Sequence, residues 1–428
     1  MAVEITKEQS DYMYNFIKEI IDKFGPRNPC TPAEKKAAEH VKKELEKSCD
    51  EAVIEPFKCV PRGLFIWIPV TVTCILISML SFIITYMVQP SRVFQVIIMI
   101  IAVLLVIIGF YVAWQQFFNY NEFLDKLFKE KESQNVIGTF KAKGERKRII
   151  LFSAHLDSAF EFNLSRISEN FQRVVIFTGF GILLVWFVLS IISLFFAIFS
   201  SIPPEIFNTV IVLVIMGIPI MVFLYFFISP GERANVVPGA IDDLSGISTV
   251  MCLSRYLKEH DDIIPDNTEI RLIAFGCEEA GLRGAYRYAA RHRDELLKYD
   301  AELVNMDGLE LGEKYHVLEF EPTTRTRHSP IVVDKIMKAT EFAGVDAHRF
   351  GGGKFEKTFG FASGGSDAAA FSKAGVKAAS MISRNVVKST HFYHLRYDTI
   401  DNVDPRAMEG ALKMCIAYLM NEKKGENE

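Results

Sequence analysis

Hydrophobic residues are concentrated in four uninterrupted blocks rather than spread along the chain. Each block is about 20 residues or longer, which is the length that a helix needs to cross a bilayer core about 30 Å thick. The pattern predicts four transmembrane helices, because charge-free runs of this length are rare in soluble folds. The blocks, which contain no Asp, Glu, Lys or Arg, are Leu64–Val88, Val93–Trp114, Val174–Ser200 and Ile206–Ile228.

Short segments join the predicted spans in pairs, so that the spans form two hairpins. The segments 89–92 and 201–205 are too short to hold a domain. Four spans also return the chain to the side of the membrane on which it started. We therefore expect one soluble domain that two membrane hairpins interrupt. The expected boundaries are 1–63, 115–173 and 229–428 for the soluble domain, 64–114 for the first hairpin and 174–228 for the second.

The soluble segments carry shorter periodic patterns, which predict alternating strands and helices. Such alternation is typical of an α/β sheet with helices on both faces. Gln115–Lys131 mixes Phe and Leu with charged residues, and we predict a helix on the membrane surface there, with core packing as the alternative. Helices are expected at Ser10–Phe24, Thr31–Ser48, Ser245–His260 and Leu282–Tyr299. Strands are expected at Ala52–Cys59, Asn135–Phe140, Arg148–Ala154, Glu269–Phe275 and Leu303–Met306.

The charge balance of the chain excludes two classes of protein. The 428 residues include 48 Lys or Arg and 52 Asp or Glu, for a formal net charge of −4. A chain this close to neutrality is not a strongly basic nucleic-acid-binding protein. A hydrophobic share of 50% also argues against an acidic disordered chain.

The distribution of basic residues predicts the side of the membrane on which the soluble domain lies. Basic residues flank the spans beside the large segments, whereas the short loops contribute only Arg92. Because basic flanks stay in the cytoplasm, we predict a multi-pass membrane protein with a cytoplasmic soluble domain. We expect no signal peptide in 1–63. The seven cysteines form no CxxC pair, which favours free thiols in a reducing compartment.

Five short motifs contain most of the residues that can bind a metal. The first, SAHLDS, places His155 and Asp157 at the expected end of a strand. The second, PGAIDDLSG, places Asp242 and Asp243 at a turn that opens a helix. Taken singly, each has an ordinary alternative, because a His–Asp pair can be a solvated surface pair and Asp243 can cap the helix.

The other three motifs add carboxylates and a second histidine. FGCEEAGLRG holds Glu278 and Glu279 directly after an apolar strand, where a charged loop is the alternative. VNMDGLE places Asp307 at the end of a short strand. HFYHLRYDTIDNVD contains Tyr393 and His394.

Together the motifs supply two histidines and three or four carboxylates, which is too many ligands for one tetrahedral zinc ion. The set fits two divalent ions that share a bridging carboxylate and lie about 3.5–4 Å apart. Imidazole and carboxylate ligands favour zinc, with cobalt or manganese as alternatives. Such ions lower the pKa of bound water towards about 7. A neighbouring Glu can then accept the proton of the water and return it to a leaving amine.

In this order, the motifs resemble those of the zinc-dependent aminopeptidases of peptidase clan MH, of the M28 type. The resemblance covers all the soluble segments, including FGPRNPCTPAEKKAAEHV and GGSDAAAFSKAGVKA. It implies the zinc exopeptidase fold, a mixed and mostly parallel sheet flanked by helices, in a membrane-embedded variant with two inserted hairpins. The long segment 158–241 departs from the family pattern, because the second hairpin lies between the first two motifs.

The resemblance implies five metal ligands. His155 and Asp307 would bind one zinc ion, and Asp242 would bridge it to the second ion. Glu279 and His394 would bind that second zinc ion. Each of these positions holds a residue type that can ligate a metal.

The resemblance also implies three supporting roles near the ligands. Glu278 would be the general base and acid. Asp157 would orient His155, as carboxylates beside ligating histidines do. Tyr393 matches a tyrosine that supports the carbonyl oxygen of the substrate in some family members.

These expectations combine into one leading interpretation, a membrane-bound di-zinc metallopeptidase that releases N-terminal residues. Its partners would be peptide or protein N-termini and the lipid bilayer, with no nucleic acid; the oligomeric state is not predicted. The alternatives are a carboxypeptidase, a single-zinc enzyme similar to glutaminyl cyclases, and a catalytically silent receptor or scaffold on the same fold.

Overall fold

The computed structural model describes residues 3–200, 202–229, 231–353, 364–384 and 392–427. The chain divides into two compact units, each made of segments that are distant in the sequence. The first unit comprises Met1–Arg62, Phe128–Glu161 and Asn235–Glu428, and the second comprises Gly63–Leu127 and Phe162–Ala234.

The first unit is built on an eight-stranded mixed sheet, as far as the described residues go. Its strand order is β1-β2-β4-β3-β5-β10-β6-β9, and β4, β3, β5 and β10 run parallel at its centre. The pairs β1/β2, β2/β4 and β6/β10 are antiparallel. The strands are β1 Glu51–Cys59, β2 Lys131–Phe140, β3 Arg148–His155, β4 Thr268–Phe275, β5 Glu302–Leu309, β6 Tyr315–Leu318, β9 Ala347–Phe350 and β10 Lys377–Ser383. The strands β7 Phe320–Glu321 and β8 Thr326–Arg327 form a separate pair.

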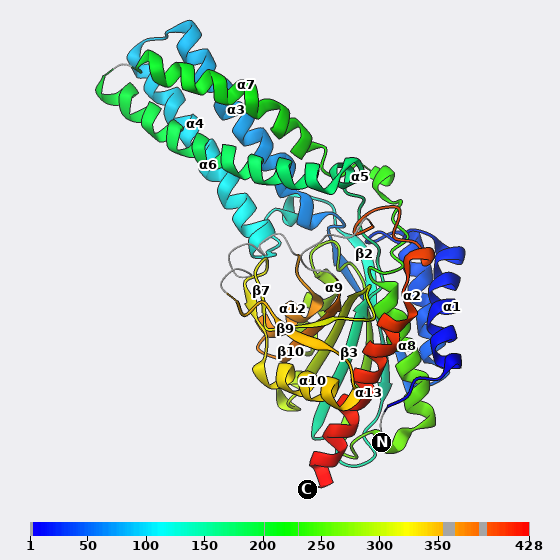
Figure 1. Ribbon diagram of the computed structural model, residues 1–428. Helices are drawn as coiled ribbons and strands as arrows, with labels where there is room; N and C mark the ends of the chain where they lie inside the picture. The colour runs from blue at the N-terminus through cyan, green and yellow to red at the C-terminus, as the bar shows by residue number, and fades with distance from the viewer. Residues whose placement is uncertain (1–2, 201, 230, 354–363, 385–391, 428) are drawn as a thin grey trace. The chain divides into compact units, whose positions relative to one another are not determined.

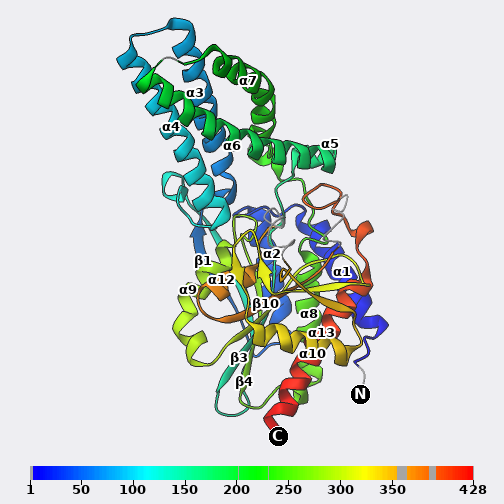
Figure 2. The same cartoon turned by 60° about the vertical axis from the view of Figure 1, so that its left-hand side comes forward.

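Different helices cover the two faces of this sheet, which gives the unit three layers (Figures 1 and 2). In β3, Ile150 and Phe152 belong to one buried hydrophobic cluster and Ile149 and Leu151 to another. Successive strand residues point to opposite faces, so a strand buried on both sides needs a continuous apolar run. The first cluster includes residues of α1 Lys7–Phe24, α2 Pro32–Leu45, α8 Leu244–Glu259, α10 Pro330–Ala343 and α13 Pro405–Asn427. The second includes residues of α9 Arg283–Lys298 and α12 Asp367–Lys373.

This architecture agrees with the α/β fold class predicted from the sequence. The expected helix start at Thr31 is also found, because the hydroxyl of Thr31 accepts a hydrogen bond from the backbone N–H of Glu34 and Pro32 is the first helical residue. Further short helical turns of this unit are η5 Asp261–Ile263 and η7 Ile400–Asn402.

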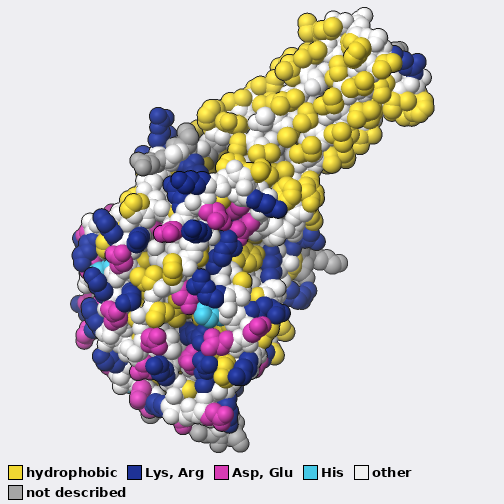
Figure 3. All heavy atoms as spheres, turned by 180° about the vertical axis from the view of Figure 1, so that it is seen from behind, with side chains coloured by type: hydrophobic (Ala, Val, Ile, Leu, Met, Phe, Trp, Pro, Cys, Tyr) yellow, Lys and Arg dark blue, Asp and Glu magenta, His cyan; other side chains and the backbone are white. Residues whose placement is uncertain are grey.

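The second unit contains four helices that are long and apolar enough to cross a membrane. Met99 and Val106 of the second helix are buried against the others, whereas Leu104 and Ile108 are exposed. Hydrophobic side chains cover the visible face of these helices in Figure 3. An apolar outer surface is what a bilayer requires of a spanning helix. The helices are α3 Trp67–Val88, α4 Arg92–Ala113, α6 Glu169–Phe199 and α7 Pro204–Tyr225.

Buried polar contacts join three of the four apolar helices, α3, α4 and α6. The indole N–H of Trp186 donates to the hydroxyl of Ser78 over 3.0 Å, and that hydroxyl donates to the carbonyl of Ala102 over 2.9 Å. Thr71 donates to the carbonyl of Gly109 over 3.0 Å. Small and hydroxyl-bearing residues allow close approach and hydrogen bonding between helices in an apolar solvent.

Each helical hairpin is tied together at its open end. The side chain of Gln116, after α4, donates to the carbonyl of Gly63, before α3, over 2.7 Å. In the second hairpin, the backbone N–H of Asn163 donates to the carbonyl of Phe227 over 3.0 Å. Entry and exit of each insertion therefore lie side by side. The short elements at these ends are η1 Gly63–Phe65, α5 Asn163–Ile167 and η4 Gly231–Ala234.

The predicted surface helix over Gln115–Lys131 is wrong. The segment instead contains two short turns, η2 Trp114–Phe118 and η3 Asp125–Leu127. The buried side chain of Gln116 explains the break, because it donates to Asp125 over 2.5 Å and accepts the backbone N–H of Leu124 over 3.0 Å. These contacts require the chain to fold back on itself.

Arg27 is the fully buried anchor that joins three loops of the first unit. Its guanidinium donates to the carbonyls of Leu156, Gly25 and Pro238 over 2.8–3.0 Å and to that of Gly239 over 3.4 Å. Buried carbonyl groups need such donors. The loop at 238–239 is thereby held beside the end of β3.

We expect Arg27→Met to lower the free energy of unfolding by roughly 3 kcal/mol or more, because each orphaned buried acceptor costs about 1–3 kcal/mol. The midpoint of thermal unfolding of the full chain in detergent micelles measures the change. Arg349→Met is the control, because Arg349 forms only exposed ion pairs with Glu319 and Asp334 and should change stability by about 0.5 kcal/mol or less. An unchanged midpoint for Arg27→Met would contradict the anchoring role.

Candidate metal centre

The residues predicted to bind metal lie together at the carboxyl ends of the central parallel strands. His155 is the last residue of β3, and Glu278 and Glu279 follow β4 after a two-residue turn. Asp307 lies near the end of β5. The carboxyl ends of parallel strands meet at one edge of a sheet, which is where open α/β sheets bind ligands. Loops bring in the remaining residues, Asp242 before α8 and His394 before η7.

Asp242 lies at the centre of this cluster. Its Oδ1 lies 3.0 Å from Nε2 of His155, and its Oδ2 lies 3.4 Å from Nε2 of His394. Nε2 of His394 is also 3.3 Å from Oε1 of Glu279. Two carboxylate oxygens of one residue therefore face two different histidines.

Two groups of ligand-type atoms share Asp242. The first consists of His155, Asp242 and Asp307, and the second of Asp242, Glu279 and His394. Within each group the ligand atoms lie within 4.8 Å of one another. This arrangement brings together all five residues that the sequence predicts as ligands.

The donor atoms fit divalent cations. Oε1 of Glu279 is buried and forms no hydrogen bond. The Nδ1–H of His155 donates to the backbone carbonyl of Asp157 over 3.1 Å. Because a carbonyl can only accept, this bond places a proton on Nδ1 and leaves Nε2, which lies 3.0 Å from Oδ1 of Asp242, as the ring atom that could ligate an ion.

The electrostatics of the cluster also fit cations. Burial raises the pKa of the Glu279 carboxyl well above its usual value, and it raises the pKa of Asp307 to about 6. Neighbouring carboxylates, Asp242 among them, raise both further. A divalent ion would offset both effects, because it stabilises the ionised carboxylates.

Asp157 supports the cluster in a way that differs in part from the predicted role. Its carboxylate lies 3.7 Å from Nδ1 of His155, whereas its backbone carbonyl forms the shorter contact. Each carboxylate oxygen instead accepts a backbone N–H over 3.0 Å, Oδ1 from Glu278 and Oδ2 from Glu279. Asp157 therefore holds the turn that carries both glutamates.

Two further aspartates hold the loop that carries Asp242. Asp398 accepts the backbone N–H of Ile241 over 2.7 Å and that of Asp242 over 3.1 Å. Burial raises the pKa of Asp398 to about 7. Asp243 caps α8 through the N–H of Gly246 and also accepts the N–H of His155, so its predicted capping role is found.

Tyr393 lies beside the cluster on the same loop as His394. The guanidinium carbon of Arg384 lies 4.8 Å from the centre of its ring. Tyr393, Arg384 and Asp242 line one small cavity of about 10 Å³, which is about the space that one water molecule needs.

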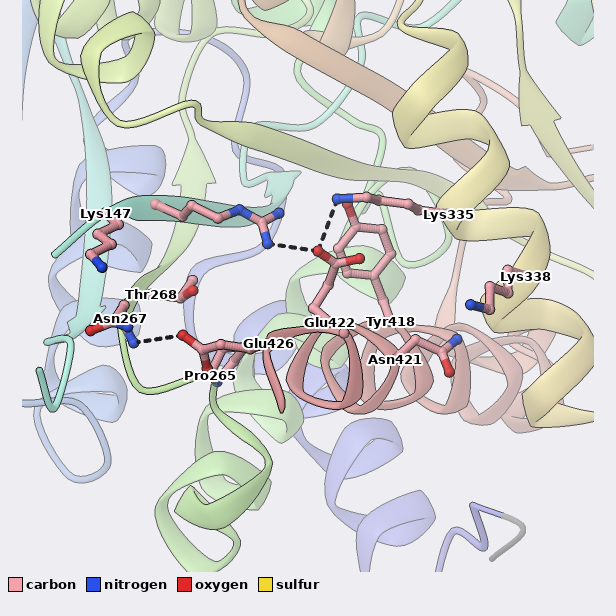
Figure 4. A pocket seen from close by; sticks show the side chains of 12 residues that line it. Lys147, Pro265, Asn267, Thr268, Lys335, Lys338, Tyr418, Asn421, Glu422 and Glu426 are labelled. Carbon is pink, nitrogen blue, oxygen red and sulfur yellow. Dashed lines mark hydrogen bonds and ion pairs between the residues drawn. The ribbon is translucent and has the colours of Figure 1, made fainter. Parts of the chain in front are cut away.

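A larger cavity, of about 620 Å³, lies at the opposite end of the strands (Figure 4). Arg148 and Thr268, the first residues of β3 and β4, are part of its lining. Glu422 forms 2.8 Å ion pairs there with both Arg148 and Lys335. Glu422 thus already pairs with two of the cations that line this cavity, and strands of eight residues separate the cavity from the candidate metal-binding groups.

Two buried acidic residues near the cluster were missed by the sequence reasoning. Both carboxylate oxygens of Asp367 are buried without a hydrogen bond, and burial raises its pKa well above the usual value. Glu34 accepts the backbone N–H groups of Cys30 and Cys277. The only signals were the motif GGSD and a Glu three residues after the capping Thr31. His391, the first residue of the motif HFYHLRYDTIDNVD, lies outside the described residues.

Comparisons with known proteins confirm the resemblance stated from the motifs. Residues 227–419 match the model of Peptidase family M28. Over 194 residues the chain is 28% identical to Aminopeptidase YwaD of Bacillus subtilis (strain 168). That match covers 45% of this chain and 39% of the relative, so the chain matches well under half of the length of that curated relative.

Solved structures with the same fold confirm the predicted fold class. The zinc aminopeptidase BSAP from Bacillus subtilis has a TM-score of 0.54 and 16% identity, over 96% of this chain and 95% of that one. An aminopeptidase from Aneurinibacillus sp. strain AM-1 has a TM-score of 0.52 and 14% identity, over 97% and 93%. A glutaminyl cyclase from Bacteroides thetaiotaomicron has a TM-score of 0.53 and 14% identity, over 98% and 100%. At these identities the similarity shows only the fold, which the aminopeptidases and the glutaminyl cyclase share.

We expect Asp157→Asn to weaken zinc affinity about 10–100-fold, the usual effect of losing a supporting residue of a metal site. The amide retains the size of the side chain but turns an NH2 group towards a backbone N–H, so one of the two glutamates loses its anchor. Calorimetric titration of zinc into metal-free full-length protein measures the affinity. Asp22→Asn serves as the control, because Asp22 is exposed and pairs only with Lys18. Equal affinities for the two variants would contradict the supporting role.

Proposed function

We propose that this protein is a membrane-bound metallopeptidase that uses two divalent ions, preferably zinc, to release N-terminal residues from peptides. The observation that carries the proposal is the carboxylate of Asp242, which lies 3.0 Å from His155 and 3.4 Å from His394. A carboxylate shared between two ligand groups is the expected arrangement of a two-metal hydrolase. The match to Peptidase family M28 supports the same assignment.

In this proposal five residues hold the ions and others handle protons. His155 and Asp307 would hold one ion, Glu279 and His394 would hold the other, and the carboxylate of Asp242 would be shared between the two groups. When bound, the ions supply Lewis acidity, which lowers the pKa of water and polarises the carbonyl of the scissile bond.

Glu278 is the proposed general base. Its Oε2 lies 4.0 Å from Nε2 of His155, and burial raises the pKa of its carboxyl well above the usual value. A carboxylate with a raised pKa is a stronger base, and it retains the proton it accepts long enough to deliver it to the leaving amine. The backbone N–H of Glu278 donates to Oδ1 of Asp157 over 3.0 Å, and this bond would hold the Glu278 backbone in position for the transfer.

Tyr393 is the proposed donor to the carbonyl oxygen of the substrate. Burial raises the pKa of its phenol above the usual value, so the hydroxyl keeps its proton at neutral pH. Tyr393 and Asp242 line the same small cavity, which supports this role.

The alternatives differ in the number of ions and in the bond that is attacked. A single-zinc cyclase on this fold, as the glutaminyl cyclase neighbours suggest, would need only one of the two ligand groups. The presence of both groups, the first with His155 and Asp307 and the second with Glu279 and His394, favours the two-ion enzyme. A silent receptor would have no reason to keep Glu278, which is outside the ligand set that shares Asp242.

We expect the zinc-loaded protein to release the first residue from peptides with a free amine and not from N-acetylated ones, with a chelator abolishing release. Glu278→Gln should lower kcat by about 10²–10⁴-fold or more while the bound zinc stays unchanged, whereas Asp242→Ala should lose zinc as well. Glu269→Gln is the control, because Glu269 is a buried glutamate at the other end of β4.

Three results would each refute part of this proposal. Release of the C-terminal residue would identify a carboxypeptidase, and ammonia release from an N-terminal glutamine would identify a cyclase. Undiminished turnover by Glu278→Gln would refute the general-base assignment.

We also propose that the four apolar helices cross a membrane and leave the peptidase unit on the cytoplasmic side. Ser91→Cys, in the short connection between α3 and α4, should then react with a membrane-impermeant maleimide in intact cells. Lys141→Cys, at an exposed position of the soluble unit, should react only after permeabilisation. Labelling is compared with the parent chain, which keeps its seven native cysteines. The reverse pattern would contradict the sidedness, and labelling of both positions in intact cells would contradict the spans.

A further inference from the structure

A second cluster of metal-ligating side chains lies outside the proposed catalytic site. It consists of Cys30 between α1 and α2, Cys59 at the end of β1, and Cys277 after β4. The Sγ of Cys30 lies 3.5 Å from the Sγ of each of the other two cysteines. All three sulfur atoms lie within 4.8 Å of one another.

These spacings suit metal ligation. Zinc–thiolate bonds of about 2.3 Å place the sulfur atoms of a tetrahedral site about 3.8 Å apart. Thiolates are the soft ligands that zinc and other thiophilic ions prefer. The sequence spacing of the cysteines gives no sign of this cluster, because the three residues come from segments that only the fold brings together.

Apolar residues surround two of the three cysteines. Cys59 and Cys277 are fully buried, in a small apolar cluster with Phe57 and Ala280. Such a pocket excludes water and protects thiolate–metal bonds from exchange with solvent.

The backbone of the cluster is held in an uncommon conformation. Cys30 has a φ of 59° and Cys277 a φ of 55°, values that side-chain-bearing residues rarely adopt. The carboxylate of Glu34 accepts the N–H of Cys30 over 2.7 Å and that of Cys277 over 3.1 Å. Both cysteines are therefore held in place at the expense of local backbone strain, a feature that is typical of functional sites.

Positive charge next to the cluster compensates the charge of a three-thiolate site. Three thiolates and one divalent ion carry a net charge of −1. Arg283 is fully buried, and its guanidinium and that of Arg287 are close enough to act electrostatically on Cys59. A buried anion needs such a partner.

We propose that Cys30, Cys59 and Cys277 form a thiolate site for one thiophilic divalent ion, with zinc as its natural occupant, separate from the carboxylate–imidazole cluster. The ion would join the α1–α2 loop and the end of β1 to the β4–α9 turn. Because Cys277 directly precedes Glu278, this ion would hold in place the segment that carries the proposed general base. The proposal concerns binding and does not depend on the reaction that the chain catalyses.

Cobalt titration of the reduced, metal-free full-length protein in detergent under anaerobic conditions tests the proposal. Thiolate ligands give an intense near-ultraviolet sulfur-to-cobalt charge-transfer band, which carboxylate and imidazole ligands do not give. We expect the band to grow to one bound equivalent in the wild type and to be lost in Cys59→Ser. Cys252→Ser is the matched control, because Cys252 is also buried but lies alone on α8; it should keep the band.

Zinc content gives a second readout. Purified Cys59→Ser and Cys30→Ser should each hold one zinc equivalent less than the wild type and Cys252→Ser, while Asp242→Ala should keep the charge-transfer band in the cobalt form. These two measurements therefore distinguish the thiolate site from the proposed catalytic site, even if the proposed reaction is wrong.

Two results would overturn the proposal. One is the absence of a charge-transfer band from wild-type protein in excess cobalt, a measurement that needs no variant and so does not depend on how the variants fold. The other is a disulfide between Cys30 and Cys59 or Cys277 in protein extracted with detergent from cells that are lysed under anaerobic conditions with rapid thiol blocking.

Discussion

Negative charge buried at one edge of a sheet is the constraint on which the rest of this structure depends. Ionised carboxylates are costly to bury unless hydrogen bonds or cations compensate them. Asp157 and Asp398 are compensated by backbone N–H groups, two each. Glu279 and Asp307 have no such anchor among the contacts described, and burial raises the pKa of both carboxyls, an effect that a bound cation would offset. The buried carboxyls that a cation would stabilise are therefore the same groups that could bind it.

The loops around this edge serve to hold the ligands at fixed distances. Arg27 joins the end of β3 to the loop before Asp242, and Asp398 fixes that loop from the other side. Asp157 accepts the backbone N–H groups of Glu278 and Glu279 and so aligns this segment. Cys277, one member of the cysteine cluster, directly precedes Glu278. Preorganisation of this kind is needed because a metal ligand misplaced by a fraction of an ångström binds poorly.

Two hairpins of apolar helices interrupt this domain without separating its candidate metal-binding groups. A helical hairpin starts and ends at the same place, so a sheet can accept one in a loop without changing strand order. The contacts of Gln116 with Gly63 and of Asn163 with Phe227 close the two hairpins at that point. The four helices concentrate apolar residues in charge-free runs, and the first unit keeps its own buried clusters on both faces of the sheet.

Regular patterns of apolar and polar residues could be read from the sequence. Contacts between segments that are far apart in the chain could not. Charge-free runs predicted the four apolar helices, and alternating strands and helices predicted the sheet, because burial on one or two faces leaves a regular pattern. Residue types after strands also predicted the ligand candidates, since parallel strands end at one edge. The predicted helix over Gln115–Lys131 failed because side-chain hydrogen bonds of Gln116 overrode local periodicity.

The sequence by itself thus determined the class of fold, the apolar spans and the residue types that can bind metal. Tertiary structure alone decided which of those residues meet, that Asp157 anchors a backbone turn rather than mainly a histidine ring, and that three scattered cysteines form one cluster. The physical reason is that distances between side chains depend on how segments far apart in the chain pack together. Spacing along the chain carries no record of that packing.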